Sequence, residues 1–432
     1  MGDATKVVIV GGGFGGLTAA RKLASSHPDP PVAVTLVDRH NYHTFQPLLY
    51  QVATAGLQPQ DIGHNLRKIF GRSRFRSQAS PVDVRMGTVA GADLEQRRIE
   101  LDDGTVLDYD VAVLAAGAVT SDYGIDGVAE HAFPLKSLSE SLTIRNHLLA
   151  CFERASAAPE RIGDGLLTFV VAGGGPTGVE LAGALTELFR VLRRDHPHLP
   201  HDQVRVVLVE MLDAVLPPYS EPSQRYTKTE LEERGVEVRL GTAIERVEAD
   251  RVVFEGGGEL ATNTLIWTAG VEAAPLAGVL GLAQGKGGRV EVDPTLRPEG
   301  FDDVFVIGDM ALARDADGEP LPQLAPVAIQ QGKHVARQLH ALVDGRPLEP
   351  FRYRDKGTMA TIGRNDAVVE FPAGVRIEGF LAWLSWLFLH LFYLVGFRNR
   401  IWVFLSWLWN YVTYDQAQRL ILRAHTRDAQ GQ

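Results

Sequence analysis

The sequence predicts an α/β fold made of two units of similar plan, the second inserted into the first, followed by a C-terminal helical segment. Two stretches about 160 residues apart share one pattern, in which an apolar run of strand length precedes a glycine cluster and an Ala/Leu-rich helical pattern. The glycine clusters span residues 11–16 and 173–178, and a later apolar strand follows each of them and ends in Ala-Gly, at Gly117 and at Gly270. Such repeats are typical of parallel sheets covered on both faces.

The remaining elements follow in the order that this fold requires. Turn signals at residues 102–104 and 255–258 predict a small hairpin between each glycine cluster and its later strand. Residues 329–343 read as an amphipathic helix, and residues 344–347 as a linker. Buried strands are expected at residues 6–10, 32–38, 110–118, 167–172, 204–210, 264–271 and 303–311. We therefore expect a first domain over 1–120 and 276–345, a second over 121–275 and a C-terminal domain over 346–432.

Composition narrows the class of protein. The chain has 432 residues, of which 45% are apolar and 22% charged, as in globular proteins of two or three domains. Cys151 is the single cysteine, which excludes an intrachain disulfide, redox chemistry through a cysteine pair and a cysteine-based zinc site. No metal site is expected.

Charge and the N-terminal sequence bear on partners and location. The net charge of −10 has the wrong sign for general nucleic-acid binding. From Gly345 onward the chain holds 11 Lys/Arg against 7 Asp/Glu, so this part carries +4 and is expected to touch something anionic. Residues 1–10 resemble no secretory signal, and a cytoplasmic catalytic body is expected.

The first glycine cluster fits the G-x-G-x-x-G pattern of dinucleotide-binding domains. Gly11 allows the tight turn, Gly13 lets the backbone approach a diphosphate, and Gly16 lets the helix pack on the strand. The diphosphate then lies at the helix N-terminus, where free N–H groups favour an anion. Asp38 ends the next strand, 22 residues after Gly16, where a carboxylate can accept both ribose hydroxyls.

The second cluster repeats the pattern with Gly173, Gly175 and Gly178, and Glu210 ends the next strand. A carboxylate at this place repels a 2′-phosphate, so NADH is favoured over NADPH. Two dinucleotide sites suggest FAD in the first domain and an exchangeable nicotinamide in the second, with hydride passing between them. The alternative is that one site is a degenerate duplication.

At this point the chain resembles the type II (non-proton-pumping) NADH:quinone oxidoreductases, a family of flavoproteins with two dinucleotide-binding domains. The resemblance covers almost the whole chain. It implies oxidation of NADH with two-electron reduction of a membrane quinone, and non-covalent FAD. A homodimer is also expected. It rests on GGGFGG (11–16), HTFQPLLYQVATAG (43–56), GGGPTGVELAGAL (173–185), FVIGDMA (305–311), LAPVAIQQGKH (324–334), YRDKGTMATIGR (353–364) and GFLAWLSWLFLHLFYLVGFRNR (379–400).

The glycine patterns and the resemblance together assign the nucleotide sites. The expected FAD-binding residues are Gly11, Gly13, Phe14, Gly15, Gly16, Asp38, Arg39, Gln46, Val89, Ala116, Gly117 and Asp309. The expected NADH-binding residues are Gly174, Gly175, Pro176, Thr177, Gly178, Glu210 and Gly270. By resemblance Asp309 binds the flavin ribityl hydroxyls, although an aspartate in a turn is also a common cap.

The resemblance further implies a quinone slot lined by Gln330, Gln331 and Lys356, with Gln330 and Lys356 as catalytic residues. Many relatives carry glutamine where this chain has Pro326, which leaves Gln330 as the better candidate for a hydrogen bond. Glu180 is the third candidate catalytic residue. Its position, which we place in the first turn of the second nucleotide helix, is equally compatible with favourable placement in the helix dipole and with a carboxylate that bridges the nicotinamide and quinone regions, as the resemblance implies.

The C-terminal segment 379–432 is expected to attach to a lipid bilayer. Residues 380–414 contain 13 aromatic side chains and no Asp or Glu, and clustered Trp and Tyr beside arginines are typical of the membrane interface. The 18 uncharged residues 380–397 fall just short of a bilayer span. Ser406, Asn410 and Thr413 form a polar stripe expected of a helix lying in the interface. We therefore expect peripheral, monotopic attachment at the cytoplasmic face, rather than a span or an oligomer interface alone.

Two alternatives remain. One is another FAD and NAD(P)H oxidoreductase of this fold, such as a ferredoxin-reductase-like enzyme, which would not need the aromatic segment. The other is a membrane-docked protein that binds NADH without turnover.

Overall fold

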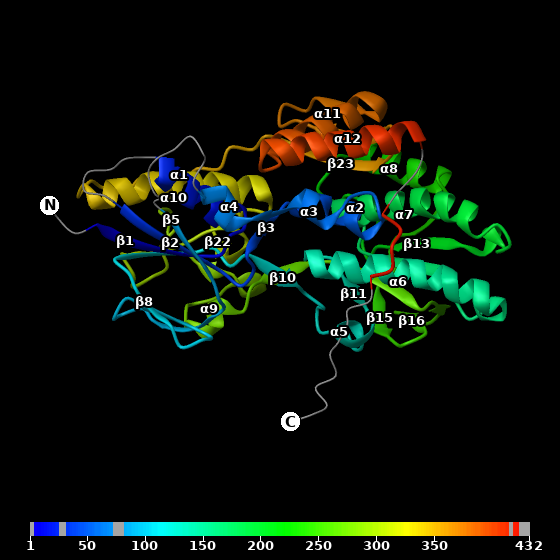
Figure 1. Ribbon diagram of the computed structural model, residues 1–432, viewed down its shortest axis with the longest axis horizontal. Helices are drawn as coiled ribbons and strands as arrows, with labels where there is room; N and C mark the ends of the chain where they lie inside the picture. The colour runs from blue at the N-terminus through cyan, green and yellow to red at the C-terminus, as the bar shows by residue number, and fades with distance from the viewer. Residues whose placement is uncertain (1–3, 26–31, 72–81, 414–417, 423–432) are drawn as a thin grey trace. The chain divides into compact units, whose positions relative to one another are not determined.

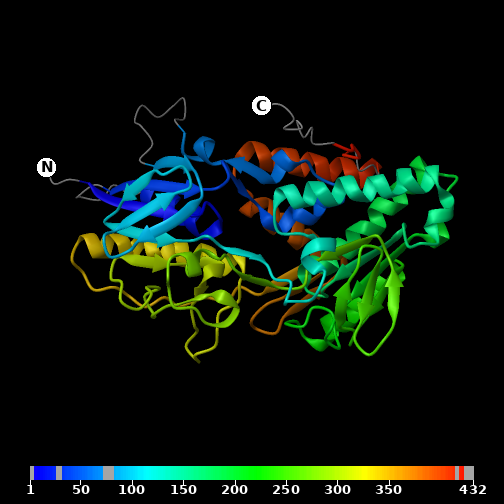
Figure 2. The same cartoon turned by 90° about the horizontal axis from the view of Figure 1, so that it is seen from below.

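The computed structural model describes residues 4–25, 32–71, 82–413 and 418–422, and the chain divides into two compact units (Figures 1 and 2). Unit 1 comprises Met1–Thr44, Gly63–Val119 and Val271–Asp355. Unit 2 comprises Phe45–Ile62, Thr120–Gly270 and Lys356–Gln432. The domains predicted from the sequence are defined by the nucleotide that each would bind, so their bounds stay a prediction. In the structure, residues 45–62 and the C-terminal segment belong to the same compact unit as the second glycine cluster.

Unit 1 is built on a five-stranded parallel sheet in the order β21-β9-β1-β2-β5. In its central strands β1 and β9, residues 7–10 and 111–114 are apolar and buried, as the sequence predicts. The strands are β1 (Thr5–Val10), β2 (Val32–Asp38), β5 (Val82–Met86), β9 (Val111–Leu114) and β21 (Val304–Val306).

Helices cover one face of this sheet and a small antiparallel sheet covers the other (Figure 1). On the helical face α1 (Phe14–Ser25) packs closely on α10 (Ala325–Val343). Glycine permits this approach, since a Cβ on Gly332 would overlap the carbonyl oxygen of Gly15. On the other face lies a three-stranded antiparallel sheet, which confirms the first predicted hairpin. Its strands are β6 (Val89–Asp93), β7 (Arg98–Leu101) and β8 (Val106–Asp108).

Short elements complete unit 1. They are β3 (Tyr42–Thr44), β4 (Gly63–Asn65), α4 (Leu66–Phe70), α9 (Leu276–Val279), β20 (Val290–Glu291), the 3-10 helix η5 (Gly308–Met310) and β22 (Ala311–Leu312). Two further strands lie where the chain passes between the units, at β10 (Ala118–Thr120) and β19 (Val271–Ala273).

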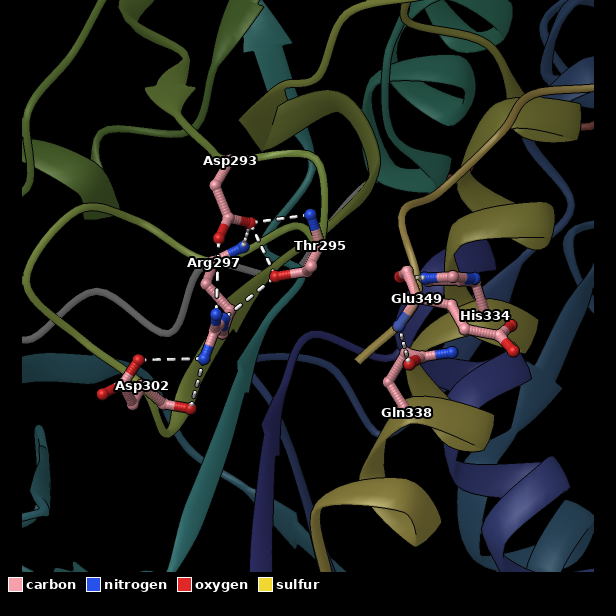
Figure 3. A network of polar contacts seen from close by, with 7 residues as sticks. All are labelled: Asp293, Thr295, Arg297, Asp302, His334, Gln338 and Glu349. Carbon is pink, nitrogen blue, oxygen red and sulfur yellow. Dashed lines mark hydrogen bonds and ion pairs between the residues drawn. The ribbon is translucent and has the colours of Figure 1, made fainter. Parts of the chain in front are cut away.

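Polar side chains fix the stretch that follows α10 (Figure 3). Gln338 accepts a hydrogen bond of 2.8 Å from the backbone N–H of Glu349, and His334 Nε2 lies 3.0 Å from the Glu349 carbonyl oxygen. A second cluster lies in the turn before β21, where Arg297 donates to Thr295 Oγ1 at 2.9 Å and to Asp302 Oδ1 at 2.9 Å. These contacts hold connecting segments that contain little regular structure.

Unit 2 repeats the plan of unit 1. Its parallel sheet has the order β11-β18-β12-β13-β14, and the second predicted hairpin forms a three-stranded sheet against one face. The opposite face packs on α6 and α7 through Phe152, Phe169 and Phe189, whose ring centroids lie 4.5–6.1 Å apart. The strands are β11 (Phe133–Pro134), β12 (Thr168–Ala172), β13 (Arg205–Val209), β14 (Val236–Arg239), β15 (Ile244–Val247), β16 (Arg251–Phe254), β17 (Glu259–Ala261) and β18 (Thr264–Trp267). The helices are α5 (Val128–His131), α6 (Leu138–Ala157), α7 (Pro176–Asp195) and α8 (Glu221–Glu233).

The C-terminal part of unit 2 forms an antiparallel sheet and two helices. These are β23 (Thr358–Gly363), β24 (Asp366–Glu370), β25 (Arg376–Glu378), α11 (Gly379–Tyr393) and α12 (Phe397–Thr413). The inserted segment supplies η1 (Gln46–Leu48), α2 (Leu49–Ala53) and α3 (Pro59–Ile62). Within the described residues, no helix has the length and apolarity needed to cross a membrane. Residues 414–417 and 423–432 of the predicted membrane segment lie outside the described residues.

One residue of the polar stripe of α12, Asn410, faces the protein, and the location of this helix in a membrane interface stays a prediction. Asn410 donates to the Gly56 carbonyl at 3.0 Å, and Trp407 on the same side donates to Gln51 Oε1 at 2.7 Å. The outward face is therefore apolar. Its exposed residues are Ile401, Trp402, Phe404, Leu405, Leu408, Trp409, Tyr411 and Val412.

Candidate functional site

The first glycine loop joins β1 to α1 in unit 1. Gly11 has a φ of +106°, and a Cβ there would overlap the carbonyl oxygen of Ala115; a Cβ on Gly16 would overlap the carbonyl oxygen of Gly11. A Cβ on Gly13 would instead meet no described atom within 4 Å. The outer two glycines are thus required by the fold, whereas the middle one leaves the backbone open to a ligand. This is the arrangement that a diphosphate at a helix N-terminus needs.

Asp38 is held beside this loop by the backbone. Its Oδ2 accepts from the Gly12 N–H at 2.6 Å, and its Oδ1 accepts from the His40 N–H at 2.7 Å. Each carboxylate oxygen has two lone pairs, so both retain acceptor capacity for ribose hydroxyls. The following residue, Arg39, is exposed.

The loop carbonyl of Gly12 lies 2.9 Å from Nδ1 of His43, a buried side chain to which the sequence assigned no role. Burial lowers the pKa of His43 to about 4, so the neutral ring donates from Nδ1. Its buried Nε2 has no hydrogen-bond partner among the described residues. An unpaired acceptor beside the glycine loop suits a ligand or a water molecule there.

The other predicted FAD residues follow neighbouring strands of the same sheet. Ala116 and Gly117 follow β9, and Asp309 lies in η5 directly after β21. Because β21, β9, β1 and β2 are parallel neighbours, these residues lie with the glycine loop at one sheet edge. Val89 begins β6 in the same unit. The residues present in unit 1 therefore fit FAD. Gln46 begins η1 and belongs to unit 2.

The second glycine loop, in unit 2, repeats this geometry. Gly173 has a φ of +102°, a Cβ on Gly178 would overlap the Gly173 carbonyl oxygen, and a Cβ on Gly175 would meet no described atom within 4 Å. The helix α7 begins at Pro176 and has no side-chain cap at Gly175. Its first turn, which includes Thr177 and Gly178, therefore offers backbone N–H groups to an anion.

Glu210 occupies the place that Asp38 has in unit 1. Its Oε2 accepts from the Gly174 N–H at 2.6 Å, and its Oε1 accepts from the Leu212 N–H at 2.8 Å. The carboxylate is thus aimed at the glycine loop, where it suits a ribose diol and opposes a 2′-phosphate.

Gly270 lies at the end of the neighbouring strand. Thr268 Oγ1 donates to the Ala172 carbonyl at 2.7 Å, which places residues 268–270 beside the glycine loop. Gly270 has a φ of +89°, so this chain end turns in a way that favours glycine.

Glu180 lies in the second turn of α7 and is buried, so our expectation of a first-turn position was wrong. A helix-dipole role is thereby disfavoured, because that effect is confined to the first turn. Glu180 Oε1 accepts from Trp386 Nε1 at 3.1 Å and from the Thr361 N–H at 3.4 Å. Burial raises the pKa of Glu180 to about 8, although both donors act in the opposite direction. The carboxyl group is therefore mostly protonated at neutral pH.

The predicted quinone residues have different surroundings. Gln331 is buried, and its Oε1 accepts from the Gly308 N–H at 2.6 Å, next to Asp309. Gln330 is tied to the backbone of Arg354, donating to its carbonyl at 2.9 Å and accepting from its N–H at 3.1 Å. Lys356 is exposed, and its Nζ lies 3.4 Å from the Tyr393 hydroxyl.

The sequence did not reveal three contacts in unit 2. Trp386 was one of five clustered tryptophans in the predicted membrane segment, and no local signal separates this buried donor from its exposed neighbours. Thr361 acts through its backbone N–H, which no side chain signals. Tyr123 lies against Gly270, and only its position directly before a glycine hinted at an unusual turn.

Comparison with known proteins agrees with this geometry. The family model described as "Pyridine nucleotide-disulphide oxidoreductase" matches residues 5–332, and "NDH2 C-terminal domain" matches residues 356–413. The chain is 38% identical to the type II NADH:quinone oxidoreductase Ndh of Mycobacterium tuberculosis, over 96% of this chain and 90% of that protein. It is 32% identical to the type II NADH:quinone oxidoreductase of Staphylococcus epidermidis, over 85% and 89% of the two chains.

Solved structures share the fold. NDH2 from Plasmodium falciparum, solved in complex with NADH, superimposes with a TM-score of 0.87 at 18% identity, over 98% of this chain and 100% of that one. The sulfide:quinone oxidoreductase of Aquifex aeolicus gives a TM-score of 0.73 at 17% identity, over 95% and 96%. Taken with the sequence relatives, these matches show that the chain belongs to the type II NADH:quinone oxidoreductase family.

Proposed function

We propose that this protein oxidises NADH and reduces a quinone by two electrons, using non-covalently bound FAD and without pumping protons. One observation carries the proposal most directly. Each unit has its own glycine loop with an open central glycine, Gly13 or Gly175, and its own strand-end carboxylate bonded to that loop. A protein with two intact dinucleotide-binding sites is suited to pass reducing equivalents from one nucleotide to another.

The residues of unit 1 would hold FAD through the glycine loop, Asp38 and Asp309. When bound there, FAD would supply the redox chemistry that couples NADH oxidation to two-electron reduction of the quinone.

The residues of unit 2 would orient NADH. The first turn of α7 binds the diphosphate, and Glu210 accepts from the adenosine ribose while repelling a 2′-phosphate. The protein thus contributes alignment and selectivity, which lower the barrier by fixing the reacting groups.

Glu180 would hold a proton for quinone reduction. Its buried carboxyl group is protonated near neutral pH, which suits a general acid. We assign the quinone slot to Gln330, Gln331 and Lys356 by family resemblance. Gln330 and Gln331 are also tied to backbone groups, so both side chains are fixed in orientation.

The exposed apolar faces of α11 and α12 support attachment to a lipid surface. On α11 the exposed residues are Phe380, Leu381, Leu384, Phe388, Phe392 and Tyr393. Contiguous apolar surface of this kind marks a membrane or protein contact. We assign the attachment to the cytoplasmic face of the membrane, where NADH is available. We also propose that the protein is a homodimer in which a second copy buries part of this surface.

The primary experiment purifies the protein in detergent, records its flavin spectrum and follows NADH oxidation with a short-chain quinone. We expect a yellow protein that consumes NADH faster than NADPH. A colourless protein that stays inactive after incubation with FAD would overturn the proposal.

Flotation with anionic liposomes tests membrane attachment, with the double variant Phe388→Gln/Trp409→Gln as the control. Light scattering in detergent tests whether the protein is a dimer.

A further inference from the structure

Tyr123 combines a bulky side chain with a backbone conformation that favours glycine. Its φ is +54°, and the residue is 66% exposed. A left-handed backbone is costly for a residue with a Cβ, and such residues gather at ligand sites. Burial of the ring in the core therefore cannot be the reason for a tyrosine here.

The turn that carries Tyr123 is fixed to the end of β18. Trp267 Nε1 donates to the Ser121 carbonyl at 2.8 Å, and the Ser121 N–H lies 3.4 Å from the Gly270 carbonyl oxygen. Asp122 Oδ1 accepts from the Gly124 N–H at 2.8 Å, which closes the turn. The position of Tyr123 is thus set by the strand that ends in Gly270.

The Tyr123 ring lies directly against Gly270. A Cβ on Gly270 would overlap the hydroxyl oxygen, Cζ and Cε2 of Tyr123. The preceding residue, Ala269, borders the glycine loop, because a Cβ on Gly173 would lie 2.8 Å from its Cα. Tyr123, Gly270, Ala269 and the loop therefore follow one another in close contact within unit 2.

The strand order decides which half of a dinucleotide would meet this ring. Glu210 follows β13 on one side of β12, and Gly270 follows β18 on the other side. A dinucleotide whose diphosphate lies at the loop after β12 spans this sheet edge. With its adenosine ribose at Glu210, its nicotinamide half extends over the end of β18, towards Tyr123.

We propose that Tyr123 is a substrate-binding residue whose ring forms a wall against the nicotinamide riboside half of NADH. The inference rests on the proposed binding of NADH to unit 2. An exposed aromatic face is suited to packing against a flat, partly apolar ligand group.

The test measures binding of NAD⁺ and of ADP-ribose, which lacks nicotinamide, to the flavin-loaded protein by calorimetry. Tyr123→Asn removes the ring, and asparagine tolerates the left-handed backbone. We expect this variant to weaken NAD⁺ binding about tenfold and to leave ADP-ribose binding within about twofold of wild type. Tyr123→Phe, which keeps the ring, should restore NAD⁺ binding to within about threefold of wild type.

Two controls separate the explanations. Glu210→Ala should weaken both ligands, and the melting temperature of Tyr123→Asn should equal or exceed that of wild type because backbone strain is relieved. Unchanged NAD⁺ binding in Tyr123→Asn, equal weakening of both ligands in it, or a Tyr123→Phe variant as weak as Tyr123→Asn would overturn the inference. If wild type binds neither ligand, the proposed function itself fails.

Discussion

The environment of Glu180 links the burial of one side chain to its chemistry. Glu180 is 8% exposed, and its carboxyl group contacts the Trp386 indole and the Thr361 backbone. Removal from water disfavours the charged form more than these two donors favour it, so burial raises the pKa to about 8. A carboxylic acid that keeps its proton at pH 7 can deliver it to a substrate, as general acids do.

The same shift predicts how stability depends on pH. The native protein retains a proton on Glu180 that the unfolded chain loses above its ordinary pKa of 4.5. Stability conferred by wild-type Glu180 therefore falls as pH rises from about 4.5 to about 8. Glu180→Gln does not titrate, so it should be more stable than wild type at pH 9, by about 3–5 kcal/mol.

Thermal unfolding of both proteins at pH 5, 7 and 9 checks this expectation. The difference in melting temperature should grow steadily across the three values. A constant difference would mean that Glu180 is ionised throughout and that its burial is compensated by other groups.

At the scale of elements, α11 joins an exposed apolar surface to a buried acid. Its outward residues include Phe388 and Phe392, whereas Trp386 on the inward side is 1% exposed and reaches Glu180. His390, one turn later, stacks on Trp386 with centroids 3.9 Å apart, and burial lowers the pKa of His390 to about 4. The inward side of α11 is thus a neutral aromatic wall with one donor aimed at Glu180.

Trp386→Phe removes that donor and keeps an aromatic ring. Loss of the hydrogen bond leaves the Glu180 carboxylate less stabilised, so the pKa of Glu180 should rise further. We expect the alkaline limb of quinone turnover to move upward by about one pH unit, since Glu180 must be protonated to act. A pH profile of kcat measures this.

Trp407→Phe is the matched control, because that indole donates 2.7 Å to Gln51 Oε1 rather than to a carboxylate. It should leave the pH profile in place. Equal displacement in both variants would indicate a general loosening of the aromatic helices and not a specific effect on Glu180.

The same helices show where sequence reasoning stops. Periodicity located seven strands of the two parallel sheets, both hairpins and the glycine loops, because these depend on residues close together in the chain. It did not locate β5, β11 and β14 of those sheets or the C-terminal sheet. Asp38 and Glu210 were found by their spacing from the glycines. The contact of Asn410 with Gly56, 354 positions away, could not be predicted from local pattern. Trp386 and Tyr123 were missed for the same reason, as their partners are set by tertiary packing and not by local pattern.

At the scale of the whole molecule, one architecture is used twice. Each unit has a parallel sheet, a small antiparallel sheet on one face, and a core of its own. Each also separates structural glycines, such as Gly16 and Gly178, from an open one. Since each glycine loop is supported by the hydrophobic core of its own unit, a substitution that disrupts one nucleotide-binding site should leave the other intact.

This independence makes a paired prediction. Gly13→Ala and Gly175→Ala each place a methyl group where no described atom lies within 4 Å, so both proteins should fold. Gly13→Ala should lose flavin absorbance while still binding ADP-ribose, because the added methyl lies where the FAD diphosphate must approach. Gly175→Ala should keep its flavin and bind ADP-ribose at least about tenfold more weakly. The ratio of flavin to protein absorbance and calorimetry with ADP-ribose measure the two effects. If either variant lost both ligands while remaining folded, the two loops would not serve separate nucleotides, and the division of labour between the units would have to be abandoned.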